Sequence, residues 1–156
     1  MKKLLLIRHA RATHDTDYPD FERPLKHSGL QDTVMIAKRL KENGMVPQLM
    51  ITSPALRAQS TANIIAEHLS LSQPQMDMSI YDASQAALLT LVTALPDDYE
   101  FIGLAGHNPG FSELLAYLTN DFREMPTCAA ALISFDVDTW QEITHGSGKI
   151  VYYTAP

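Results

Sequence analysis

Short, mainly apolar runs alternate along the chain with segments in which apolar residues recur at the spacing of a helix face. Runs of this length are typical of buried strands. They predict strands over residues 3–8, 49–52, 76–81, 101–105, 130–137 and 149–154, of which 76–81 is the weakest. The segments with helical spacing predict helices over residues 28–43, 54–69, 84–95 and 111–119.

Residues that favour helix ends mark the boundaries of these segments. Ser28 and Gln31 have the spacing of a capping box, so the first helix is predicted to begin at Ser28 and to end before Gly44. Proline follows the expected cap residue of two later helices, and proline is favoured in the first turn. The cap residues expected for the second, third and fourth helices are Ser53, Ser84 and Asn108.

Strands that alternate with helices are typical of an α/β fold, in which right-handed crossovers build a largely parallel sheet. We therefore predict a three-layer sandwich with a mostly parallel central sheet flanked by helices, and antiparallel pairing near the C-terminus. The length of 156 residues suits one domain, residues 1–156, with a core of its own.

Composition and charge exclude several classes of function. A net charge of −6 leaves no basic face for a nucleic-acid backbone or a membrane surface, so neither is an expected partner. Cys128 has no other cysteine to pair with, which fits a reducing compartment, and its expected role is that of a small buried hydrophobe. The apolar run before Arg8 is too short for a signal peptide or a membrane span, so the predicted location is the cytoplasm.

Cationic and imidazole side chains follow three of the predicted strands. Arg8 and His9 follow the first, Arg57 follows the second, and His107 follows the strand 101–105. Because parallel strands place their carboxyl ends at one edge of the sheet, these residues can converge on one crevice. Taken singly, Arg57 could point into solvent or pair with an acidic side chain, and each histidine could satisfy a hydrogen bond at the edge of the core. Together they predict phosphate chemistry, since arginine matches the fork of phosphate oxygens and imidazole is a nucleophile near neutral pH.

The ordered set of motifs resembles the histidine phosphatase superfamily, with its phosphoglycerate-mutase-like fold, and its small SixA-type phosphohistidine phosphatase branch. The motifs that carry the resemblance are Arg8-His9-Ala10, Arg23-Pro24-Leu25, Ser53-Pro54 with Arg57 and Thr61-Ala62, and Gly106-His107-Asn108. The resemblance implies a covalent mechanism in which His9 attacks phosphorus while Arg8, Arg57 and His107 hold the phosphoryl oxygens. It also implies that Arg23, in the long loop over residues 9–27, lines the pocket, and that no metal or cofactor is needed.

The leaving-group side of the predicted site is less defined. Larger relatives use a glutamate as general acid; here Asp82 is the nearest candidate by order, with a solvated loop residue as the alternative. An imidazole leaving group needs less acid help, which favours a protein phosphohistidine as substrate, such as that of a histidine phosphotransfer domain, with inorganic phosphate as product. The alternatives are a phosphatase of small phosphomonoesters and a non-catalytic phosphate-binding module.

Overall fold

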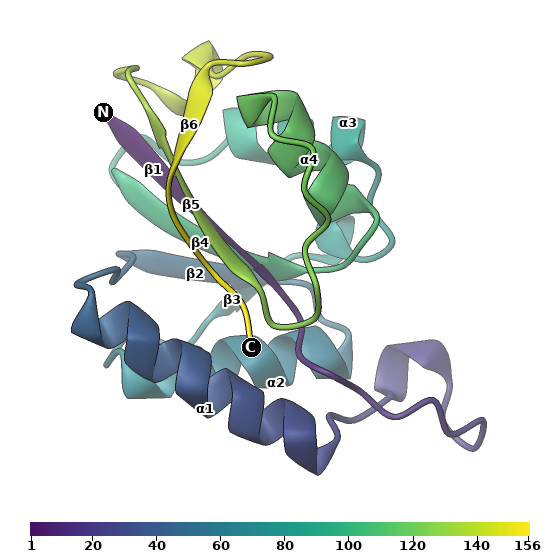
Figure 1. Ribbon diagram of the computed structural model, residues 1–156. Coiled ribbons are helices and arrows are strands. Elements are labelled where there is room, and N and C mark those ends of the chain that lie inside the picture. Colours follow the sequence, from purple (N-terminus) through teal and green to yellow (C-terminus); the bar gives the residue numbers. More distant parts are fainter.

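The computed structural model describes residues 1–156 and contains a six-stranded sheet in the order β3-β2-β4-β1-β5-β6 (Figure 1). The strands are β1 (Lys2–Arg8), β2 (Leu49–Thr52), β3 (Gln75–Met76), β4 (Phe101–Gly106), β5 (Ala130–Phe135) and β6 (Gly148–Thr154). The pairs β1–β4, β2–β4 and β2–β3 are parallel, whereas β1–β5 and β5–β6 are antiparallel. The predicted sheet, mostly parallel with antiparallel pairing near the C-terminus, is confirmed.

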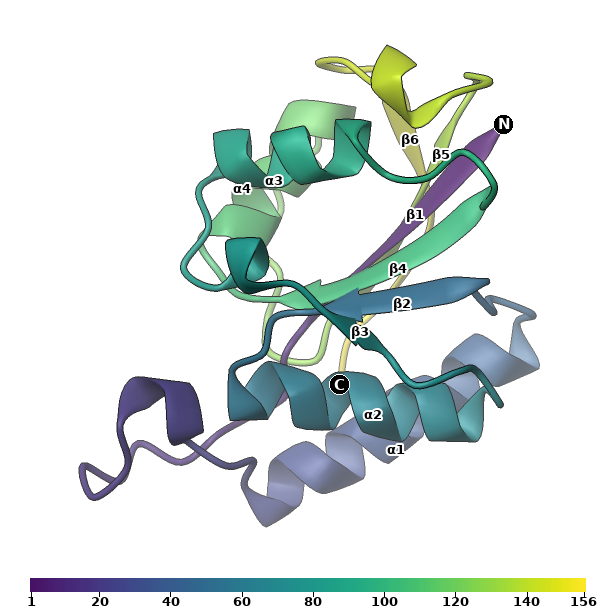
Figure 2. The same cartoon turned by 180° about the vertical axis from the view of Figure 1, so that it is seen from behind.

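Two helices cover each face of the sheet, which makes the molecule the predicted three-layer sandwich (Figures 1 and 2). On one face lie α1 (His27–Glu42) and α2 (Leu56–His68), and on the other lie α3 (Gln85–Thr93) and α4 (Gly110–Thr119). Three short 3-10 helices complete the chain: η1 (Asp20–Glu22), η2 (Met78–Ile80) and η3 (Trp140–Glu142). Neither the length nor the apolar character of any helix suffices for a passage through a bilayer.

The central strand β1 is apolar on both faces because both faces are covered. Leu4 and Leu6 pack into the core cluster beneath α3 and α4, while Leu5 and Ile7 pack into the cluster beneath α1 and α2. Side chains of a strand alternate between the two faces, so a strand buried on both sides must be a continuous apolar run. The core therefore fixes β1, and with it the position at which Arg8 leaves the sheet.

The predicted start of α1 at Ser28 is wrong. The helix begins at His27, its cap position is Lys26, and no side chain caps it. Pairing of the preceding loop sets this start: the Lys26 amide donates to the carbonyl of Arg11 at 2.9 Å, and a Cβ at Gly29 would overlap that same carbonyl oxygen. At the other end Gly44 adopts a φ of +68°, as expected for a residue just beyond a helix.

The other helix signals are confirmed in part. Ser84 caps α3, accepting a hydrogen bond from the Ala87 amide at 3.1 Å. Asn108 accepts from the amide of Ser112 at 3.1 Å, although α4 itself begins at Gly110. The strand predicted over 76–81 is mostly wrong, because only Gln75–Met76 pairs with β2 and the next residues turn into η2.

Candidate active site

The neighbouring strands β1 and β4 end side by side and place two histidines next to each other. Arg8 and Gly106 are partners in the parallel register, and the His9 amide donates to the carbonyl of Gly106 at 2.9 Å. The rings of His9 and His107, one residue beyond each strand, lie 5.2 Å apart between centroids. Arg57 approaches from the first turn of α2. The structure thus brings the four predicted residues to one cavity of about 290 Å³.

His9 is held with one defined ring nitrogen available. Its Nδ1 lies 2.8 Å from the carbonyl oxygen of Ala10, and because a carbonyl only accepts, Nδ1 carries the proton. Burial lowers the pKa of His9 to about 4, with the charges of Arg57 and Arg8 acting in the same direction. At neutral pH the ring is therefore uncharged, and its Nε2 has a free lone pair, which is the state that a nucleophile needs.

His107 is oriented by Ser53, which does not cap α2 as predicted. The Ser53 hydroxyl lies 2.8 Å from Nε2 of His107 and accepts the Ala55 amide at 3.2 Å, while α2 begins only at Leu56. Burial is the main cause that lowers the pKa of His107 to about 3, and His9 and Arg57 add to it. Nδ1 of His107 is buried and has no hydrogen-bond partner in the protein.

The glycine before His107 serves packing rather than ligand space. A Cβ at Gly106 would lie 2.5 Å from the ring of Phe111 and 2.8 Å from Ile80. The space beside Gly106 is therefore filled by the core and offers no room for a ligand.

Arg8 and Arg57 are held in the same way, by contacts to their terminal nitrogens. Nη1 of Arg8 donates to the carbonyl of Met125 at 3.0 Å. In Arg57, Nη1 donates to the carbonyl of Asp20 at 2.7 Å and Nη2 to its carboxylate at 3.1 Å. The Nε of each arginine is buried and has no partner, and burial lowers the pKa of Arg8. Since buried donors are nearly always satisfied, these groups indicate a site for an anion.

Asp20, which sequence reasoning missed, connects the long loop to the site. Its carboxylate accepts hydrogen bonds from Tyr81 at 2.6 Å, from Arg57 at 3.1 Å and from Arg23 at 3.1 Å. The Tyr81 hydroxyl is the main cause that lowers the pKa of Asp20 to about 2, and Arg57 contributes. The same hydrogen bond raises the pKa of Tyr81. Asp20 lies three residues before Arg23, an ion-pair spacing that was the one available signal.

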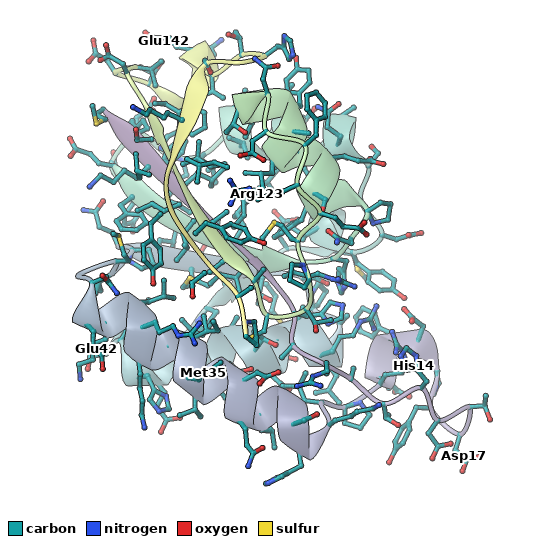
Figure 3. All side chains as sticks on the ribbon, in the orientation of Figure 1. His14, Asp17, Met35, Glu42, Arg123 and Glu142 are labelled. Carbon is teal, nitrogen blue, oxygen red and sulfur yellow. The ribbon has the colours of Figure 1, made fainter.

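Arg23 and Asp82, the other two residues predicted for the site, line different cavities. Arg23 lines the cavity that contains His9 and donates through Nη1 to the carbonyl of Thr13 at 3.0 Å. Asp82 lies instead in an adjoining cavity of about 280 Å³. His14, on the loop that projects from the molecule in Figure 3, is exposed and also lines the cavity that contains His9.

The site is suited to binding a tetrahedral anion beside a nucleophile. Arg8 and Arg57 supply two permanent positive charges, and His9 supplies a neutral imidazole. Clusters of three or more histidine, cysteine or acidic side chains that could hold a metal ion are not found. Phosphoryl transfer depends mainly on positioning and charge stabilisation, which these side chains provide.

Comparison of the sequence with known families and proteins agrees with this geometry. The model of the histidine phosphatase superfamily (branch 1) matches residues 4–80. An uncharacterized chloroplastic protein of Arabidopsis thaliana is 29% identical over 161 residues, which span 94% of this chain and 72% of that protein. An uncharacterized protein of Picosynechococcus sp. is 34% identical over 116 residues, spanning 71% of this chain and 69% of that protein.

Solved structures share the fold over nearly the whole chain. The protein histidine phosphatase SixA complexed with tungstate superposes with a TM-score of 0.84 at 22% identity, covering 98% of this chain and 96% of that chain. A protein of Agrobacterium tumefaciens proposed to be the phosphohistidine phosphatase SixA gives a TM-score of 0.86 at 21% identity, covering 99% and 98%. A mycobacterial glucosyl-3-phosphoglycerate phosphatase gives 0.74 at 14% identity, covering 99% of both chains.

Proposed function

The chain belongs to the histidine phosphatase superfamily, and from that premise we propose that it is a metal-independent phosphatase that hydrolyses phosphohistidine in a protein. The observation that carries the proposal is the neutral Nε2 of His9 in a cavity where the Nε donors of Arg8 and Arg57 are unpaired. Catalysis needs both features, because donors that hold a phosphate without a nucleophile beside them would support only a binding site.

The reaction proceeds in two displacements. Nε2 of His9 attacks phosphorus, the bond from phosphorus to the leaving nitrogen breaks, and the leaving imidazole takes the electron pair. Water then attacks the phosphorylated His9, releases inorganic phosphate and restores the free imidazole. Arg8 and Arg57 stabilise the negative charge of the phosphoryl oxygens in both steps, because charge-assisted hydrogen bonds are the strong ones.

His107 supplies a third donor to the phosphoryl group. When the Ser53 hydroxyl donates to Nε2 of His107, the neutral ring carries its proton on Nδ1, the nitrogen that has no partner in the protein. That proton is then available to a phosphoryl oxygen. The low pKa of His107 supports this role, since it keeps the ring in its uncharged form at neutral pH.

The fold shared with SixA supports a phosphorylated protein as substrate. A histidine phosphotransfer domain of a cytoplasmic signalling relay is the partner that we propose. The competing proposal is a phosphatase of small phosphomonoesters, which the likeness to the glucosyl-3-phosphoglycerate phosphatase supports. A module that binds phosphate without catalysis is the third, and the available nucleophile of His9 argues against it.

Replacement of His9 tests the mechanism. We expect His9→Ala to abolish hydrolysis of a phosphorylated histidine phosphotransfer domain, whereas His145→Ala, an exposed histidine beside Tyr117, retains wild-type turnover. Wild-type enzyme quenched in alkaline denaturant, in which the phosphoramidate bond is stable, should carry phosphate on His9, detected by mass spectrometry. Retained turnover in His9→Ala rejects the mechanism. Turnover of esters with none of phosphohistidine selects the small-molecule alternative.

A further inference from the structure

Two cavities meet at the site, and their walls carry opposite charges. They share Arg57, His107 and Asn108. The first, which contains His9, is lined further by cationic side chains, namely Arg8, Arg11, Arg23 and Lys26. The second is lined further by Asp20, Tyr81, Asp82, Ala83 and Pro109, so that apart from Arg57 its only charged groups are carboxylates.

The direction of attack assigns the second cavity to the leaving group. In phosphoryl transfer the attacking and leaving atoms lie roughly in line on opposite sides of phosphorus. His9 lines the first cavity and is absent from the second, whereas Arg57 and His107 face both. Both residues are more than nine-tenths buried, at 6% and 9% exposed, and each has an unpartnered nitrogen. A phosphoryl group held between them directs its leaving group away from His9.

The chemistry of the second cavity favours a leaving group that is neutral or positively charged. A carboxylate or phosphate there would meet Asp20 and Asp82, and Arg57, the one cation of this wall, is paired with Asp20 and directed to the phosphoryl group. Asp20 is already engaged, through Tyr81, Arg57 and Arg23. Asp82 has no ion pair; it is exposed, lines this cavity and adopts a left-handed conformation with a φ of 53°. Its carboxylate is the acceptor available to a ligand.

We propose that this second cavity is an imidazole subsite, in which the Asp82 carboxylate accepts a hydrogen bond from the distal N–H of the phosphohistidine ring. The inference rests on the proposed function. With the distal nitrogen protonated, the bond between phosphorus and the proximal nitrogen breaks and the electron pair stays on that nitrogen. The ring then leaves as neutral imidazole without any proton transfer from the enzyme. Asp82 therefore acts ionised, as an acceptor that retains the ring proton, and not as the general acid considered for an ester.

The test compares Asp82→Asn with wild-type enzyme on three small probes: N-phosphorylimidazole, phenyl phosphate and 3-phosphoglycerate. Asparagine tolerates the left-handed backbone as aspartate does, so the variant retains the local fold. Loss of a charged hydrogen bond to the ring should lower kcat/KM for N-phosphorylimidazole by about tenfold or more. Phenyl phosphate should change less than about twofold, and 3-phosphoglycerate should improve as a repulsive charge is removed. Asp98→Asn, an exposed carboxylate outside both cavities, is the matched control and should leave all three rates unchanged.

The outcomes separate this inference from the proposed function. If wild-type enzyme hydrolyses N-phosphorylimidazole and Asp82→Asn hydrolyses every probe as wild type does, the subsite is rejected and the proposed function stands. An equal loss on all three probes also rejects it, because Asp82 then has only a structural role. If wild-type enzyme hydrolyses the esters but neither N-phosphorylimidazole nor a phosphohistidine protein, both are rejected.

Discussion

The side-chain oxygen of Ser53 lies 2.8 Å from Nε2 of His107, and this contact connects the residues that follow β2 and β4. Both residues are buried, and the same Ser53 oxygen accepts the amide of Ala55. The hydroxyl carries one proton, and Nε2 of His107 is the one acceptor that it meets, so we assign Ser53 as the donor in this hydrogen bond. The contact orients the His107 ring and favours the tautomer with its proton on Nδ1.

Ser53→Ala should therefore reduce catalysis through His107. Without the hydroxyl, Nε2 of His107 loses its partner, and the ring is no longer held in the tautomer that presents a proton on Nδ1. We expect kcat to fall by about tenfold, the scale of one lost hydrogen bond in a buried network. Steady-state kinetics on any hydrolysed substrate measures the effect.

Ser84→Ala separates this effect from helix capping. Ser84 caps α3 and touches neither histidine, so its loss should cost about 1 kcal/mol of stability without changing kcat. A Ser53→Ala enzyme that loses stability but keeps wild-type kcat would show that Ser53 serves only the turn before α2.

Arg57→Lys should not preserve function although the charge is kept. The guanidinium binds Asp20 through its terminal nitrogens and still has Nε unpaired, whereas an ammonium is a single point of charge. A lysine at this position can therefore bind either Asp20 or the phosphoryl group, but not both. We expect kcat/KM to fall by about a hundredfold, the scale of one removed transition-state donor. Arg123→Lys, paired with Asp121 away from both cavities, is the control expected to keep wild-type kinetics. An active Arg57→Lys enzyme would mean that charge alone suffices.

The two site histidines should remain uncharged well below neutral pH. The pKa of His9 is lowered to about 4 and that of His107 to about 3, from 6.5. NMR titration of the ring carbon-bound protons should therefore show both rings neutral at pH 5.5, and both titrating near 6.5 in denaturant. Inorganic phosphate should raise both values, because the bound anion offsets the charges of Arg8 and Arg57. Normal titration of either ring in the folded protein contradicts the burial argument.

The same shifts make folding stability depend on pH. Below about pH 6.5 the unfolded chain binds protons at these histidines, whereas the folded chain does so only near 4 and 3. Because the unfolded state binds more protons in that window, stability falls as pH is lowered from about 6.5 towards 4. Urea denaturation at pH 7 and pH 5 should show a smaller free energy of unfolding at pH 5. In the doubly substituted His9→Ala, His107→Ala protein this part of the difference should disappear.

The sequence predicts those parts of the site that depend on strand ends. Arg8, His9 and His107 follow apolar runs. The backbone topology of a parallel sheet places the ends of such runs together, independently of side-chain contacts. The roles of Ser53 and Asp20 depend on side chains that meet across 54 residues, from Ser53 to His107, and across 61, from Asp20 to Tyr81. No local pattern encodes such contacts.

The same reason explains the error at the start of α1. A capping box is a local signal, and it predicts a start at Ser28 from Ser28 and Gln31 alone. The observed start is set by the bridge between Ala12 and Leu25 and by the contact of Gly29 with Arg11, which are tertiary interactions of the long loop. The tertiary contacts of the loop that carries Asp20 and Arg23 outweigh the local signal for a helix start at Ser28.

Gly29→Ala tests whether this loop contact determines the start of α1. Alanine favours a helix over glycine by about 1 kcal/mol, so propensity alone predicts a more stable protein. A Cβ at Gly29 would instead overlap the carbonyl oxygen of Arg11, and relief of that overlap must shift either the helix or the loop. We expect thermal or urea denaturation to show a net loss of about 1–3 kcal/mol. Ser28→Ala is the matched control: since no side chain caps α1, its stability should change by less than about 0.5 kcal/mol. Stabilisation by Gly29→Ala together with destabilisation by Ser28→Ala would restore the capping box as the start of the helix.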